Sequence, residues 1–227
     1  MINVFLLSKL IFKDLLEYLK HKKDKKPHKY GVYGFFGLPG AGKTMSMCHY
    51  LNEQRMKYKD NIYISTNFNY KYQDFAFDSY KDLLKEYDKT IIFAWDEIQN
   101  EFNSRDFKKF PPEFLTLLTQ NRKGNGKQII YTAQSYDRVD KVIRELTHKF
   151  YYCKSLFFAR LTTQKVYSNK KAYILNNSLK EVKADSKSMF IQTDELRNCY
   201  NSYLYLDSAL KRLDDDYSNK NNTEIQN

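Results

Sequence analysis

Cysteine, histidine and long apolar runs are all scarce in this chain of 227 residues. The three cysteines are odd in number and widely spaced (Cys48, Cys153 and Cys199), which is typical of reduced thiols in a cytoplasmic protein. Neither the cysteines nor the four histidines have the spacing of metal ligands, so we expect no structural metal. The sequence also lacks internal repeats, a helix-turn-helix pattern and a zinc pattern, which argues against repeat proteins and against those two kinds of DNA-binding module.

Basic residues are in excess. Lysine and arginine number 38 against 27 aspartates and glutamates, which gives a formal net charge of +11. Such a balance favours a polyanionic partner, either nucleic acid or an anionic membrane. The abundance of Lys, Asn, Tyr, Ile and Phe is also what AT-rich coding would produce, so the charge by itself does not choose between these interpretations.

One stretch carries the complete pattern of a phosphate-binding loop, G-x-x-x-x-G-K-[ST]. It reads Gly37-Leu38-Pro39-Gly40-Ala41-Gly42-Lys43-Thr44, between a predicted buried strand at 30–36 and a predicted helix at 45–57. Backbone N–H groups of such a loop surround a phosphate, and the helix dipole adds to the attraction. We therefore expect ATP to bind here, with Lys43 at the β- and γ-phosphates and the Thr44 hydroxyl as a ligand of Mg²⁺.

A second strand, at 90–97, is apolar and ends in Asp96 and Glu97. In open α/β sheets the ligand lies at the carboxyl edge of the strands, so both carboxylates should face the phosphates. Asp96 is expected to hold the Mg²⁺ ion through its hydration shell, and Glu97 to polarise the water that attacks ATP. Two other predicted strands, at 61–67 and 127–134, end at the same edge in Asn67 and Gln134. Gln134 would sense the γ-phosphate or the water there.

Two common nucleotide-binding classes fit poorly. A nucleoside kinase usually has a lid with several arginines, but residues 68–90 contain none. A GTPase normally carries an Asn-Lys-x-Asp motif at a strand end, and this motif does not occur. A mechanical ATPase, of the kind that completes each site with an arginine from the neighbouring subunit, fits better.

The first 20 residues have apolar positions at helical spacing, interrupted by charges such as Lys9, Lys13 and Glu17. The segment is too short and too charged to span a bilayer, and it lacks the cleavage site of a signal peptide. Three interpretations stay open: a helix packed on the domain or on a neighbouring subunit, a helix in a membrane interface, or a helix that binds a partner. A basic linker follows at 20–29.

Together these motifs resemble the zonula occludens toxin-like ATPases of phages, which are related to the FtsK/HerA translocases. The layout is also similar to the DNA-packaging ATPases of small tailed phages. The resemblance covers roughly residues 30–155 and rests on the following stretches: Gly37–Thr44, the strand end at Ser65-Thr66-Asn67, Trp95-Asp96-Glu97, Gln120-Asn121-Arg122, Tyr131-Thr132-Ala133-Gln134 and Ile143-Arg144.

The resemblance implies a ring-forming ATP hydrolase (a pentamer or hexamer) that moves double-stranded DNA in the host cytoplasm, most simply a packaging motor that docks on a phage portal. It implies that Arg122 reaches the γ-phosphate of a neighbouring subunit, with Arg138, Arg144 and Arg105 as reserve candidates. It also implies that Asn67 holds Glu97 away from the water until substrate engages. The alternative is a membrane-peripheral assembly or extrusion ATPase, whose membrane contact would be the N-terminal helix.

We therefore expect an α/β fold of the P-loop NTPase type, with a mainly parallel sheet flanked by helices and a small β-rich or mixed C-terminal addition. The expected organisation is an N-terminal helix and linker at 1–29, an ATPase core at 30–155, C-terminal strands and helix at 156–213, and a disordered tail at 214–227. Two lysine- and arginine-containing stretches are guesses at DNA-gripping loops: Arg105, Lys108 and Lys109, or Lys123 and Lys127.

Overall fold

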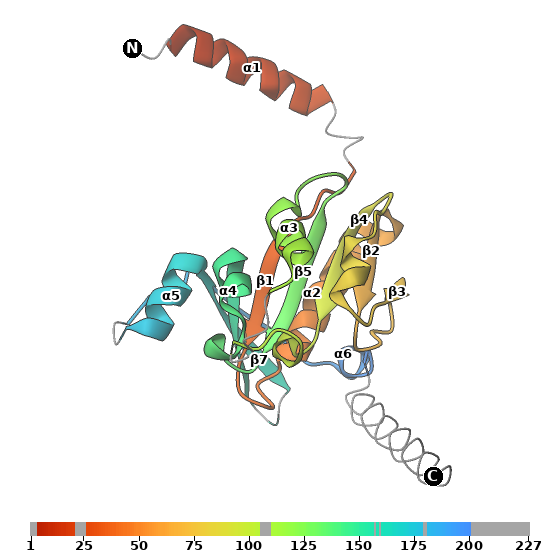
Figure 1. Ribbon diagram of the computed structural model, residues 1–227, viewed down its shortest axis with the longest axis vertical. Helices are drawn as coiled ribbons and strands as arrows, with labels where there is room; N and C mark the ends of the chain where they lie inside the picture. The colour runs from red at the N-terminus through yellow and green to blue at the C-terminus, as the bar shows by residue number, and fades with distance from the viewer. Residues whose placement is uncertain are drawn as a thin grey trace, which may run out of the picture.

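A computed structural model describes residues 4–20, 26–104, 110–156, 158, 160–178 and 181–200. In these residues a single eight-stranded sheet, in the order β3-β2-β4-β5-β1-β6-β7-β8, is flanked by helices on both faces (Figure 1). The strands are β1 Gly31–Phe36, β2 Ile62–Thr66, β3 Phe75–Ala76, β4 Thr90–Trp95, β5 Lys127–Ala133, β6 Thr147–Leu156, β7 Leu161–Ser168 and β8 Ser186–Ile191. The α-helices are α1 Val4–Lys20, α2 Lys43–Tyr58, α3 Pro112–Gln120, α4 Lys141–Leu146, α5 Asn169–Asn177 and α6 Asp194–Arg197.

The six strands from β3 to β6 in this order are all paired in parallel. β7 is antiparallel to both β6 and β8. Helices α2, α3 and α4 connect successive parallel strands, as parallel pairing requires. The predicted fold class, a mainly parallel sheet flanked by helices, is confirmed. The predicted β-rich C-terminal part continues this same sheet as β7 and β8.

The central strands are buried on both faces, and their alternate residues enter two separate cores. On β4, for example, Phe93 and Trp95 belong to a core shared with α3, α4 and α5, whereas Ile92 and Ala94 belong to a core shared with α2. Because every parallel strand in the centre ends at one edge, the segments that follow β1, β2, β4 and β5 are brought together there.

Three predicted helices differ from the structure. The helix expected at 81–87 is a 3₁₀ turn over Tyr80–Leu84, capped by Ser79 as predicted, and Leu84 is exposed rather than facing inward. The helix expected at 113–122 ends at Gln120. The helix expected from Asp194 onward stops at Arg197; its remaining residues beyond 200 lie outside the described part of the chain. Neither α5 nor β8 is predicted by pattern, because β8 buries only Phe190 and so shows no apolar alternation.

Helix α1 lies apart from the sheet and its helices (Figure 1). The side chains of residues 8–16 are all exposed, among them Ile11 and Phe12, which are 58% and 61% exposed. Of the three interpretations of this helix, packing on its own domain is therefore not what the structure shows. Within the described ranges, no helix combines the length and hydropathy needed to cross a bilayer.

Gly34 on β1 tests how tightly the sheet is packed against α3 and α4. A Cβ at this position would lie 2.5 Å from the ring of Phe36 and 2.7 Å from the ring of Tyr131. Both rings are fully buried, so they have little room to shift. We expect Gly34→Ala to lower the free energy of unfolding by about 1–3 kcal/mol, the usual cost of overpacking. Urea denaturation would measure it, and an unchanged midpoint would show that the core is looser than the distances imply.

Candidate functional site

The loop between β1 and α2 has the backbone conformation that its glycines permit. Gly40 and Gly42 have φ angles of 76° and 81°, in the left-handed region that side-chain-bearing residues avoid. Gly42 caps the amino end of α2, and the loop is closed by a hydrogen bond from the Ala41 N–H to the Leu38 carbonyl (3.0 Å). The unpaired N–H groups at the start of a 16-residue helix thus border the loop, which suits it to bind an anion.

Lys43 and Glu97 meet beside this loop. The Lys43 Nζ atom lies 3.5 Å from the Glu97 Oε1 atom. The Lys43 side chain is 7% exposed and that of Glu97 is 26% exposed, so water screens this pair only partly. The predicted phosphate-binding cation and the predicted general base are therefore brought together across one sheet edge.

The Asp96 carboxylate joins three elements of the fold. Its Oδ1 atom accepts hydrogen bonds from the hydroxyl of Thr44 on α2 (3.0 Å) and from the hydroxyl of Thr132 on β5 (2.6 Å). Burial raises the pKa of Asp96, and the two hydroxyls and the Lys43 charge oppose that rise. The donor set consists of hydroxyl and carboxylate oxygens, the ligands that Mg²⁺ prefers, so Thr44 and Asp96 fit a Mg²⁺ site next to bound phosphate.

Glu97 has an unusual backbone conformation for a residue with a side chain. Its φ is 54°, in the left-handed region, directly after β4 ends. The Thr132 hydroxyl accepts a hydrogen bond from the Glu97 N–H (2.8 Å) and helps to hold this turn. Such strain persists only where surrounding contacts fix it, and it occurs often at functional sites. Here the turn sends the Glu97 carboxylate toward Lys43.

Asn67 does not hold the Glu97 carboxylate as the resemblance implied. Its side-chain amide pairs with the backbone of Asp96: Oδ1 accepts from the Asp96 N–H (2.7 Å) and Nδ2 donates to the Asp96 carbonyl (3.2 Å). The second oxygen of Glu97, Oε2, accepts instead from the side-chain amide of Gln99. The physical reason is register, since β2 and β4 are neighbours and Asn67 follows β2 at the level of Asp96.

Gln134 lies at the predicted edge, directly after β5, where its side-chain oxygen accepts a hydrogen bond from Arg138. Arg144, another reserve candidate, is paired with Asp137 (3.3 Å) and lies over the ring of Tyr136. Arg105 lies outside the described residues, as do Lys108 and Lys109.

Arg122 is not near these residues within one subunit. It is exposed in the turn between α3 and β5, at the end of β5 opposite to Gln134. The seven residues of β5 separate it from the phosphate-loop edge by roughly 20 Å, at about 3.3 Å per residue. Position thus rules out action on its own loop without a large rearrangement.

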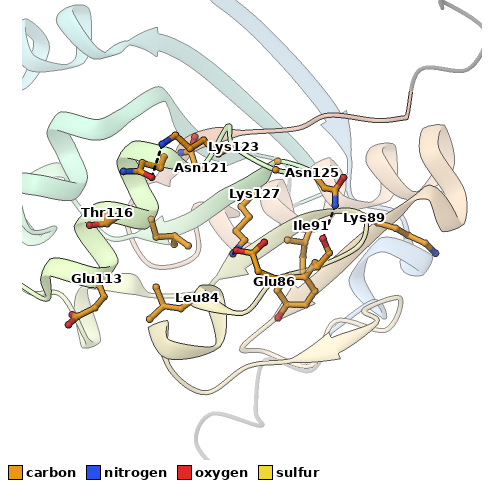
Figure 2. A pocket seen from close by; sticks show the side chains of 15 residues that line it. Leu84, Glu86, Lys89, Ile91, Glu113, Thr116, Asn121, Lys123, Asn125 and Lys127 are labelled. Atoms are coloured by element: carbon orange, nitrogen blue, oxygen red, sulfur yellow. Dashed lines mark hydrogen bonds and ion pairs between the residues drawn. The ribbon is translucent and has the colours of Figure 1, made fainter.

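A cavity of about 290 Å³ lies near this turn, at the amino ends of β4 and β5, and the phosphate loop has no part in its lining (Figure 2). Lys127 contributes its ammonium group to the structure there, by hydrogen bonds to the carbonyls of Leu83 (3.1 Å) and Lys85 (2.7 Å). Glu86 lies 3.9 Å from the same group, as Figure 2 shows. Lys127 therefore does not serve as an exposed DNA-gripping residue.

Sequence patterns missed several residues at the site. Thr132 was quoted only within a strand; a hydroxyl in an otherwise apolar strand was the available signal. Nothing in the sequence singled out Gln99 or Tyr200, whose hydroxyl is a hydrogen-bond partner of Thr44. The tips of β6 and β7 were missed as well: a Cβ on Gly42 would lie 2.6 Å from the Ser155 hydroxyl and 3.0 Å from that of Thr162.

Comparisons with solved structures support the fold. The chain is similar to the N-terminal domain of zonular occludens toxin from Neisseria meningitidis, with 18% identity, a TM-score of 0.51, and coverage of 76% of this chain and 99% of that one. It is also similar to the genome packaging NTPase B204 from Sulfolobus turreted icosahedral virus 2 in complex with ATP-gammaS, with 13% identity, a TM-score of 0.46, and coverage of 62% and 93%. A search of curated protein sequences finds no match.

A family model supplies the remaining comparison. The model described as Zonular occludens toxin (Zot) matches residues 74–193, which is more than half of the chain. The matched segment contains Asp96, Glu97 and the strands from β4 to β8. The chain therefore belongs to the zonular occludens toxin family, as its motifs predicted.

Proposed function

We propose that this protein is an ATP hydrolase that drives the movement of double-stranded DNA, as a ring-forming genome-packaging motor in the host cytoplasm. The observation that carries the hydrolase is the convergence of Lys43, Thr44, Asp96 and Glu97 on the phosphate loop. Belonging to the same family as a structurally similar toxin domain supports the fold, and the net charge of +11 supports a polyanionic partner.

Each side chain has a distinct part in the proposed reaction. Loop N–H groups and the Lys43 ammonium neutralise the β- and γ-phosphates of ATP, and the Glu97 carboxylate accepts the proton of the attacking water. Mg²⁺, when held at Thr44 and Asp96, would neutralise charge that develops on the phosphates. Gln134 is the remaining polar group at this edge and is placed to orient the water.

The ion pair between Lys43 and Glu97 suggests how hydrolysis is restrained without substrate. Both oxygens of the Glu97 carboxylate are engaged, Oε1 by Lys43 and Oε2 by Gln99. A phosphate that attracts Lys43 competes with Glu97 for the same charge, which frees Oε1 to polarise water. In this account Gln99 takes over the restraining part that the resemblance gave to Asn67.

Glu97→Gln tests the hydrolase directly. It removes the base but keeps the shape of the side chain, so the variant should bind ATP and hydrolyse it at least about a hundredfold more slowly. Lys43→Ala is the companion variant and should lose ATP binding or turnover, because the phosphates lose their cation. Nucleotide binding by fluorescence and phosphate release would be measured together. Wild-type turnover in either variant would remove the proposed mechanism.

Arg122 is proposed to complete the site of a neighbouring subunit. Its place at the opposite edge of the sheet excludes its own phosphate loop but leaves it free to face another copy. A charge supplied in trans contributes about 10³–10⁵ in rate in ATPases and GTPases where it has been isolated.

A mixing experiment tests this assignment. Arg122→Ala and Glu97→Gln subunits are each expected to be inactive alone. In mixed rings, some interfaces pair an intact Glu97 site with an intact neighbouring Arg122, so partial ATP turnover should return. Mixed rings without recovered turnover would refute action in trans, and full activity of Arg122→Ala alone would remove the residue from the site.

A second candidate function is a membrane-peripheral assembly or extrusion ATPase, and α1 is the observation that favours it. Its exposed apolar residues Ile11, Phe12, Leu15 and Leu16 are followed by a basic linker, the composition of a helix that lies in an anionic membrane interface.

The two candidates separate by what stimulates ATP turnover. A packaging motor should respond to duplex DNA, whereas a membrane-peripheral ATPase should respond to vesicles that contain anionic lipid. Vesicle flotation should show binding that Ile11→Asp with Leu15→Asp abolishes, while ATP turnover of that variant in solution stays the same. Stimulation by vesicles and not by DNA would favour the second candidate over the first.

A further inference from the structure

We propose that the exposed face of β6, β7 and β8 contacts the phosphate backbone of double-stranded DNA. This proposal rests on the proposed function for the identity of the polyanion, and on the structure for the position of the surface. We call this surface the lysine face; it consists of Lys154 on β6, Lys165 on β7 and Lys187 on β8.

Strand register places the three lysines on one face. Lys165 and Lys187 are directly opposite each other in the antiparallel pair of β7 and β8. On β6, Tyr152 is opposite Lys165, and Lys154 lies two residues further along the same face. All three lysines are exposed. They form a continuous basic row across three hydrogen-bonded strands.

The charges on this face have no carboxylate to balance them. Residues 147–168 and 186–191, which contain all three strands, include no aspartate or glutamate. Among the described ion pairs, none involves these three lysines. Like charges directly opposite on neighbouring strands destabilise a sheet, so the Lys165–Lys187 pair has a cost that a bound polyanion would offset.

The face is open where it approaches the phosphate-loop edge. Helix α5 covers its other end, where the Asn176 side chain bonds to the Tyr152 hydroxyl at 2.5 Å. Beyond Lys154 the side chains of Met189 and Ile191 are 69% and 67% exposed. Duplex DNA carries a charge every ~1.7 Å along its axis, so a row of exposed lysines on a flat sheet can contact several phosphates at once.

The opposite face of the same strands holds the phosphate loop. Lys154 is followed by Ser155, and Ser155 and Thr162 are paired across β6 and β7 against Gly42. Gln192, which follows β8 and is 3% exposed, donates a hydrogen bond to Thr162 (2.7 Å). DNA on the lysine face would thus lie one residue away, along the strand, from side chains that touch the loop. This closeness predicts that DNA bound there changes the rate of ATP turnover.

The experiment compares two triple variants of the full chain that lose the same charge. Lys154→Gln, Lys165→Gln and Lys187→Gln remove the lysine face. The matched control, Lys57→Gln, Lys81→Gln and Lys123→Gln, removes three exposed lysines elsewhere and includes the alternative basic loop. Binding of a fluorescent duplex of random sequence is measured by anisotropy between about 50 and 200 mM salt, without nucleotide.

If the three lysines each contact a phosphate, the slope of log affinity against log salt should fall by roughly 2.7 in magnitude, about 0.9 for each contact. The control should change this slope much less, and DNA stimulation of ATP turnover should survive in the control and be lost in the lysine-face variant. Equal effects of the two variants, or a wild-type protein that binds vesicles or acidic peptide but no duplex DNA, would overturn the proposal.

The design separates this proposal from the proposed function. Anisotropy without nucleotide measures the lysine face even if the wild-type protein hydrolyses no ATP, an outcome that would defeat the hydrolase. Basal ATP turnover should be the same in both triple variants, because none of the six lysines belongs to the phosphate-loop site.

Discussion

The Asp96 carboxylate is the group on which the site depends. One oxygen atom accepts the hydroxyls of Thr44 and Thr132, and Asn67 binds the backbone of the same residue from β2. Four elements, β2, β4, β5 and α2, are therefore held at one point of the sheet edge. A buried carboxylate is costly unless hydrogen bonds or charges satisfy it, which is why burial raises its pKa and two hydroxyls are committed to it.

The turn after Asp96 follows from this constraint. With Asp96 fixed and the Thr132 hydroxyl accepting from the Glu97 N–H, Glu97 is held at a positive φ that a free chain would avoid. Its carboxylate then faces Lys43. The arrangement places an acid and a base of opposite charge beside the phosphate loop, where a bound phosphate would compete for the lysine.

The C-terminal strands add a second surface to the same edge. β6 and β7 are antiparallel, so adjacent residues alternate between the face that touches Gly42 and the face that carries the unbalanced lysines. A surface formed by three strands of the main sheet is rigid, and it is better suited than a loop to pass a contact on to the site.

The motifs in the sequence determined much of this protein. The phosphate loop and the strand that ends in Asp96 and Glu97 are local patterns, since a glycine loop between a strand and a helix has few alternative conformations, and a fully apolar strand must be buried. From these the family, the fold class and the edge of the sheet where the site lies could be predicted. β8 and α5 could not be predicted, because exposed strands and short helices show little apolar periodicity.

Only the tertiary structure decided which side chains meet. Asn67 pairs with the Asp96 backbone and not with the Glu97 carboxylate, because the register of β2 on β4 sets the level at which β2 ends. Arg122 lies at the far edge because α3 runs back across the sheet before β5 begins. The lysine face likewise depends on pairing between strands that are separated in sequence. Sequence spacing carries no information on such pairings, since hydrogen-bond register between distant strands is fixed by how the whole core packs.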